Sequence, residues 1–146
     1  MIRCLIAGAL ALVLSACATT PRSEPVLDGP IRNIHSGDLM RYWVPSNETV
    51  RIPGHGMRVD CGYVLQQFVI DSAGEIRGYE VLEAAPDERL AGDALRAIAG
   101  FDYRAAETNP DRTPVRLRLM TTFDRNGGED CEWPEVEPLA PRHGEG

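Results

Sequence analysis

The sequence predicts a small α+β domain in which a three-stranded, antiparallel-type sheet carries one main helix on one face. Two β-rich stretches, Tyr63–Asp71 and Ile76–Leu82, are separated by a tight turn at Ser72–Gly74, which predicts a hairpin. Apolar residues at helical spacing follow between Leu90 and Ala99. A last stretch, Val115–Phe123, alternates apolar and polar residues as a half-buried strand does. The order is therefore hairpin, crossover helix and third strand.

The turn and the helix carry local signals at their ends. Gly74 suits a turn position with positive φ. Pro86 interrupts the chain, Asp87 is placed to accept N–H bonds as the helix N-cap, and Gly100 is placed to end the helix. The stripe expected to face the sheet consists of Leu90, Ala91, Ala94, Leu95 and Ile98, with Asp93 and Arg96 outward.

The third strand is expected to lie at an edge of the sheet. A right-handed crossover makes it parallel to the second strand and leaves the first strand between them. Alternation then assigns its side chains to two faces. The inward set is Val115, Leu117, Leu119, Thr121 and Phe123, and the outward set is Arg116, Arg118, Met120 and Thr122.

Residues 1–16 have the pattern of an export signal, because Arg3 precedes an apolar stretch, Leu5–Leu14, that is too short to span a bilayer. The run Leu14-Ser-Ala-Cys17 resembles the lipobox of bacterial lipoproteins, whose cysteine is acylated and becomes the N-terminus. An ordinary signal peptide beside a cysteine is the alternative. The lipobox interpretation predicts that Cys17 carries lipid, palmitate included, and tethers the protein to a membrane. Ala18 in place of Asp favours the outer membrane, with the protein facing the periplasm.

Two of the four cysteines remain after this assignment. Cys4 leaves with the signal peptide and Cys17 takes lipid, so Cys61 and Cys131 form an even pair in an exported chain. Such a pair predicts a disulfide, with metal binding or free thiols as alternatives. The topology agrees, because Cys131 follows the third strand and Cys61 precedes the first, and these two ends are neighbours.

Composition limits the partners and divides the chain. The formal charge is −7, and removing residues 1–16, whose one charge is Arg3, changes it to −8. An acidic chain without a visible basic face is not a general nucleic-acid binder. The predicted parts are a signal peptide (1–16), a flexible spacer (17–37), a domain (38–133, core 63–124) and an acidic Pro/Gly-rich tail (134–146) expected to be disordered. The mixed pattern of Leu39–Val59 predicts one or two short strands packed on the domain.

The block from 63 to 124 resembles the C-terminal domain of the TonB energy-transducer family. The matching residues are Phe68, Ile70, Asp71 and Gly74 in the hairpin, Leu90, Ala94, Leu95 and Ile98 in the helix, Phe101, Tyr103, Arg104 and Ala106 after it, and Pro114, Val115 and Phe123 in the last strand. The chain departs from the family at Ala105, where Pro is usual, at Ala91, where Asp is usual, and at Ala84-Ala85-Pro86, which replaces a Ser-rich turn.

This resemblance implies a periplasmic domain whose exposed third strand pairs with an extended peptide from an outer-membrane receptor, by β-augmentation. The expected contact residues are Arg116, Arg118, Met120 and Thr122. The alternative is that outward arginines only protect the edge from aggregation. Leu65 and Val69, on the face without the helix, would be covered by a second copy in a homodimer or by the segment Leu39–Val44.

The function expected from these features is a lipid-anchored binding module in envelope transport or assembly. A lipid anchor cannot receive work from a motor helix, so energy transduction is not expected. The alternative is a structural envelope lipoprotein that binds peptidoglycan or another envelope protein. No enzymatic activity, metal or cofactor is predicted, since His35, His55 and His143 are dispersed and no nucleophile or phosphate-loop motif is present.

Overall fold

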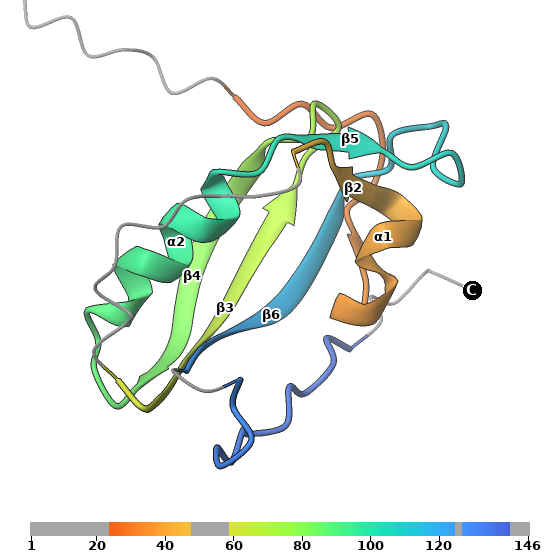
Figure 1. The fold of residues 1–146 in the computed structure, drawn as a ribbon. Helices are drawn as coiled ribbons and strands as arrows, with labels where there is room; N and C mark the ends of the chain where they lie inside the picture. The colour runs from red at the N-terminus through yellow and green to blue at the C-terminus, as the bar shows by residue number, and fades with distance from the viewer. Residues whose placement is uncertain (1–23, 48–58, 125–126, 141–146) are drawn as a thin grey trace, which may run out of the picture.

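A computed structural model describes residues 24–47, 59–124 and 127–140. The elements, in chain order, are β1 (Arg32–Asn33), a 3-10 turn (Ser36–Asp38), α1 (Leu39–Tyr42), β2 (Trp43–Pro45), β3 (Cys61–Ile70), β4 (Ile76–Ala85), α2 (Leu90–Ala99), β5 (Tyr103–Ala105) and β6 (Val115–Asp124) (Figure 1). The α+β class is as predicted, but the sheet differs from the prediction.

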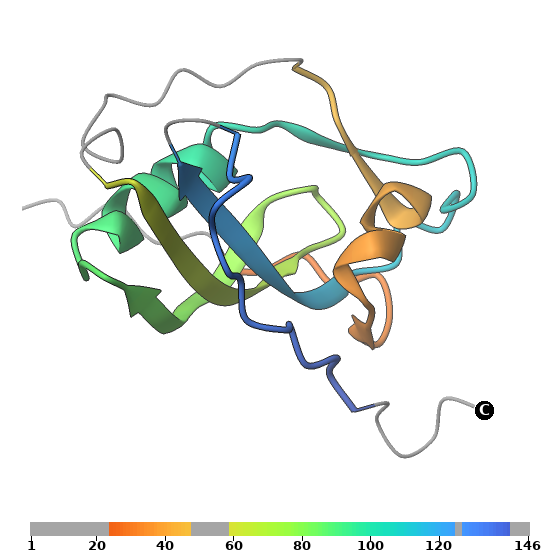
Figure 2. The ribbon, with the colours of Figure 1, turned by 60° about the horizontal axis from the view of Figure 1, so that its bottom comes forward.

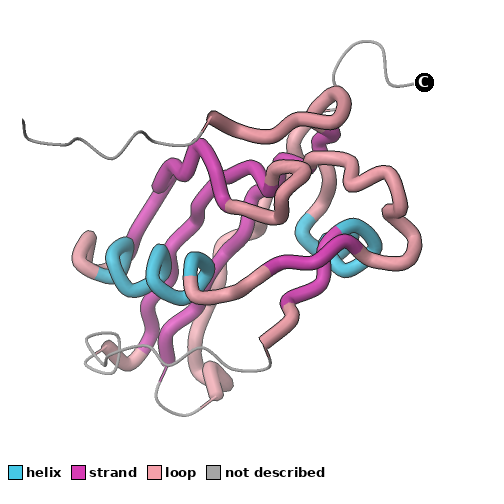
Figure 3. Tube along the Cα trace, turned by 90° about the horizontal axis from the view of Figure 1, so that it is seen from above, coloured by secondary structure: helices cyan, strands magenta, loops and turns pink. Residues whose placement is uncertain are grey.

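The main sheet has four strands in the order β1-β6-β3-β4. The predicted hairpin is β3 and β4, and β3 lies between β4 and β6 as the crossover rule requires. The prediction of three strands is wrong, because β1 pairs in parallel with the start of β6, and β2 and β5 form a separate antiparallel pair. The long helix α2 covers one face of the sheet, which Figure 3 shows from above.

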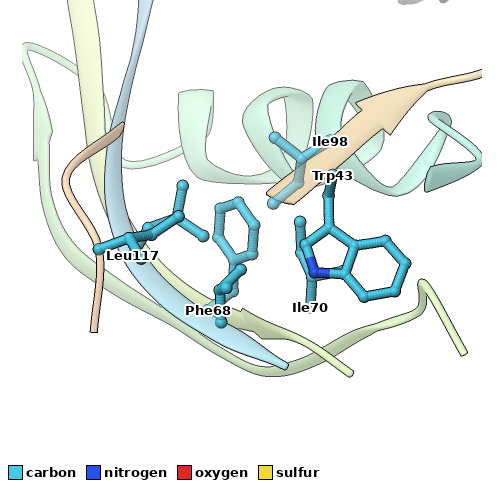
Figure 4. Close-up of a cluster of buried hydrophobic side chains, with 7 residues drawn as sticks. Trp43, Phe68, Ile70, Ile98 and Leu117 are labelled. Atoms are coloured by element: carbon cyan, nitrogen blue, oxygen red, sulfur yellow. The ribbon is translucent and has the colours of Figure 1, made fainter. Parts of the chain in front are cut away.

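The hydrophobic core lies between this face and the elements that cover it. Trp43, Phe68, Ile70, Ile98 and Leu117 are buried together (Figure 4). Trp43 is fully buried, and its Nε1 donates to the carbonyl of Thr113 at 3.1 Å. The segment around Trp43 thus packs on the same face as α2, so the expectation that Leu39–Val44 covers Leu65 and Val69 on the opposite face is wrong.

The helix spans the predicted residues but is turned relative to the predicted stripe. Its buried residues are Leu90, Asp93, Ala94, Ala97 and Ile98, which are spaced three and one apart along a single face. Leu95 is 39% exposed, although its apolar side chain predicted an inward position. Asp93 is buried rather than outward, and Arg96 Nη2 donates to its Oδ1. At Leu95 and Asp93, the position on the helix decides whether the side chain is buried, and its apolar or charged character does not.

The hairpin turn is held by the carboxylate of Asp71, which is fully buried. Oδ1 accepts from the amides of Ala73 (2.9 Å) and Glu75 (3.0 Å), and Oδ2 accepts from the Val26 amide (3.3 Å) and from Arg77 Nε (3.0 Å). Burial alone raises the pKa of Asp71, but these hydrogen bonds outweigh burial and lower the pKa below its ordinary value.

Gly74 has φ of +86° as predicted, and a Cβ there would meet the Tyr103 carbonyl oxygen at 2.2 Å. Both the backbone angle and the close approach of β5 therefore require glycine at this position.

The segment predicted as a free spacer reaches the sheet in its second half. Ser72 donates its amide to the Val26 carbonyl at 2.8 Å, and the Ser72 Oγ accepts from the Asp28 amide at 2.9 Å. Ile34 is buried in the core beside β1. Residues 26–34 therefore belong to the packed domain, whereas the first part of the predicted spacer lies outside the described residues.

Candidate strand-pairing edge

The short strand β1 shows which main-chain groups of β6 face the outer edge. The amides of Arg32 and Ile34 donate to the carbonyls of Pro114 and Arg116, each at 2.9 Å. Main-chain groups alternate in direction along a strand, and the N–H and C=O of one residue point to the same side. Beyond Arg116, the N–H and C=O groups of Arg118, Met120 and Thr122 must therefore point to the outer edge.

This edge is open over most of its length. β1 ends at Asn33, which pairs with Arg116, and no other described strand pairs with β6 on that side. The eight residues from Leu117 to Asp124 span about 26 Å at ~3.3 Å per residue. Of the four predicted edge residues, Arg116 is already covered by β1, and the other three lie in the open part.

Side chains of the same residues lie on the sheet face opposite α2. The register places Gln67 opposite Arg118 and Leu65 opposite Met120. Arg118 and Met120 direct their main-chain groups away from β3, so these are non-hydrogen-bonded pairs. In such pairs the facing side chains come closest. Arg118 Nε donates to Gln67 Oε1 at 3.4 Å. The edge thus has outward main-chain groups, and beside them lie the Arg118 guanidinium and the apolar pair of Leu65 and Met120.

The other long edge strand, β4, is a poorer template. Leu65 pairs with Glu83 but Gln66 pairs with Val81, so Leu82 is an extra residue on β4. A second register shift lies between Gln67 and Val69. Such bulges bend and twist a strand and protect its edge against pairing. By contrast, β6 pairs with β3 without any shift.

The predicted disulfide joins Cys61 and Cys131, whose Cα atoms are 5.6 Å apart. Cys61 lies opposite Asp124, the last residue of β6. The bond therefore fixes the chain after β6 to the end of the candidate edge. In the chain-entropy model, a crosslink over 70 residues stabilises the fold by about 4 kcal/mol.

The chain after the disulfide lies beside β6 in two views (Figures 1 and 2). Arg118 Nη1 donates to the Glu137 carbonyl at 3.4 Å, and Asn33 Nδ2 donates to the Ala140 carbonyl at 2.7 Å. The described part of the tail, 134–140, therefore contacts the domain. Neither contact was expected from the sequence, in which the spacing of Trp133, Val136 and Leu139 was the available signal.

Of the three histidines and Cys17, His35 is the one that lies among the described residues. His35 Nδ1 accepts from the Gly37 amide at 3.1 Å, whereas Cys17, His55 and His143 lie outside the described residues. Within the described ranges, no group of three or more His, Cys, Asp or Glu residues is arranged to hold a metal ion.

A hollow of about 450 Å³ beside the hairpin turn is lined partly by Glu75, Asp102 and Tyr103, and the described residues of its wall include no histidine, serine or cysteine. None of the helices in the described part of the chain has the length and apolar character that crossing a membrane requires.

The fold is similar to that of the TonB C-terminal domain of Pseudomonas aeruginosa, which was solved in solution by NMR. The match covers 64% of this chain and 95% of that one, with a TM-score of 0.52 and 19% sequence identity. No family model matches the sequence, and no curated protein matches it. At this identity the similarity establishes the fold alone, and it confirms the fold that the residues of the 63–124 block predicted.

Proposed function

We propose that this chain is a lipid-anchored, periplasm-facing binding module that pairs the open edge of β6 with an extended segment of an envelope protein. The observation that carries the proposal is the unpaired, regular edge from Leu117 to Asp124, next to the short strand β1. A partner strand would continue the sheet through the outward N–H and C=O groups of Arg118, Met120 and Thr122. An outer-membrane receptor of the TonB-dependent type is the partner class that the resemblance suggests.

The proposed role is passive and non-catalytic. An anchor at Cys17 would hold the domain at the outer membrane without linking it to an energy source. A Cys17→Ser variant should then lose palmitate labelling and membrane fractionation. Retention of the variant in the membrane fraction would contradict the anchor but not the pairing edge.

Crosslinking in cells tests the edge directly. A photoreactive amino acid at Thr122 lies on the open edge of β6, and the same group at Leu82 lies exposed on the bulged edge strand β4. We expect a discrete protein adduct from position 122 and none from position 82. Equal adducts from both positions, or an adduct from position 82 alone, would show that β6 is not the binding edge.

A structural envelope lipoprotein remains the second candidate, because a segment of the chain itself already lies beside the edge. In that case the adduct at Thr122 would be absent, and the protein would sediment with purified cell wall with or without substitutions in β6.

A further inference from the structure

The segment from Cys131 to Ala140 follows β6 in the opposite direction. Its start is fixed at the end of β6 by the disulfide, its Glu137 carbonyl meets Arg118, and its Ala140 carbonyl meets Asn33, the partner of Arg116. Nine residue steps of the tail thus pass along eight residue steps of β6. The tail therefore advances roughly 3 Å per residue, close to the rise of a polyproline II helix.

The exposure pattern agrees with that conformation. Trp133, Val136 and Leu139 are partly buried, and the residues at intervening positions are exposed except Pro134. A period of three residues is that of polyproline II. The tail consequently directs one apolar row towards the domain and its acidic residues Glu132, Glu135 and Glu137 towards solvent.

The contact lies against side chains beside β6 and does not pair with the edge. The tail forms no β-ladder with β6, and its one main-chain hydrogen bond among the described residues runs from the Cys131 amide to the Gly128 carbonyl. It is held by two side-chain donors, Arg118 and Asn33. Asn33 Oδ1 is buried there without a hydrogen-bond partner in the described part of the chain. An added strand would satisfy the outward main-chain groups that this contact leaves unpaired.

We propose that residues 132–140 are a built-in competitor that occupies the surface beside β6 until a partner strand displaces them. The disulfide keeps the segment at an effective concentration on the order of millimolar, so weak contacts are sufficient to hold it in place. The inference rests on the proposed function of the edge, but the contact can be tested without any partner.

The experiment compares the mature chain with a chain that ends at Cys131 and therefore keeps the disulfide. A synthetic peptide of residues 132–140 is titrated into both, and amide chemical shifts are recorded by NMR. We expect saturable shifts at Arg118, Met120 and Thr122 in the shortened chain, and about a tenth of that response or less in the full chain, where the attached segment competes. A scrambled peptide is the control.

Absence of shifts in the shortened chain, or equal shifts in both chains, would overturn the proposal. If shortening disturbs the fold, the same titration is made on full-length Trp133→Ala/Leu139→Ala, for which the response should exceed that of the unaltered chain; an equal response would also overturn it. Peptide binding combined with no crosslinked partner at Thr122 would refute the proposed function and leave the competitor intact. A crosslinked partner combined with no peptide binding would refute the competitor alone.

Discussion

Proline substitutions at two neighbouring positions of β6 test which main-chain groups face the open edge. The alternation set by β1 directs the Leu119 N–H towards β3, opposite Gln66, and the Met120 N–H towards the outer side. Leu119→Pro removes a ladder bond and leaves the main-chain carbonyl of buried Gln66 unsatisfied, at a cost of ~1–3 kcal/mol. This loss is a large share of the ~5–15 kcal/mol typical of a domain.

Met120→Pro removes an N–H that makes no bond within the sheet, and proline is tolerated where the N–H side of an edge strand faces solvent. We expect a loss of about 1 kcal/mol or less from the backbone change. Urea unfolding followed by circular dichroism measures both values, and Leu119→Ala and Met120→Ala separate side-chain losses from those of the proline ring. Equal destabilisation by the two prolines, or the reverse order, would contradict this assignment of the outward N–H groups. A stable Met120→Pro chain that still binds its partner unchanged would also remove β6 as the pairing edge.

Two further predictions concern buried polar groups. Gln66 is fully buried, and its Nε2 donates to Thr121 Oγ1 at 2.8 Å. Thr121→Val should therefore cost ~1–3 kcal/mol in urea unfolding, whereas Thr122→Val on the opposite face should cost less than about 0.5 kcal/mol; equal costs would contradict the network. The pKa of Asp71 is lowered in the folded state, so its contribution to stability is present above the unfolded pKa and is lost as the pH falls through the folded pKa. Asp71→Asn should be less stable than the unaltered protein at pH 7, and the difference should shrink below about pH 4; a constant difference would show that the lowered pKa is not the cause.

The parts of the fold that the sequence predicts well have signals within a few residues. Gly74 marks the turn, the spacing from Leu90 to Ala99 marks the helix, and the alternation after Val115 marks the last strand; each is found where expected. The strand β2 (Trp43–Pro45) lies in the segment Leu39–Val59, where one or two short strands were predicted, but β1 lacks such a signal. β1 has two residues, too few for any periodicity. It pairs with residues more than 80 positions further along the chain, Arg32 with Val115.

The sequence predicted the residues of the candidate site but not the point at which the open edge begins. Alternation identified Arg118, Met120 and Thr122, but only the pairing of Asn33 with Arg116 shows where the open edge begins. The burial of Asp93 could not be predicted from the helix pattern, because the pattern assigns apolar residues to the buried face and charged residues to solvent. At the edge, the deciding contact joins residues far apart in the chain, which local patterns do not encode.

The pairing of β1 with β6 and of β2 with β5 has a consequence for the order in which the molecule can form. Both N-terminal strands pair with residues far later in the chain, Arg32 with Val115 and Trp43 with Ala105. A chain that is threaded through a membrane from its N-terminus can complete neither pair until those distant residues have emerged. β1 and β2 must then stay unpaired until those residues emerge, and they are added to a hairpin and helix already in place.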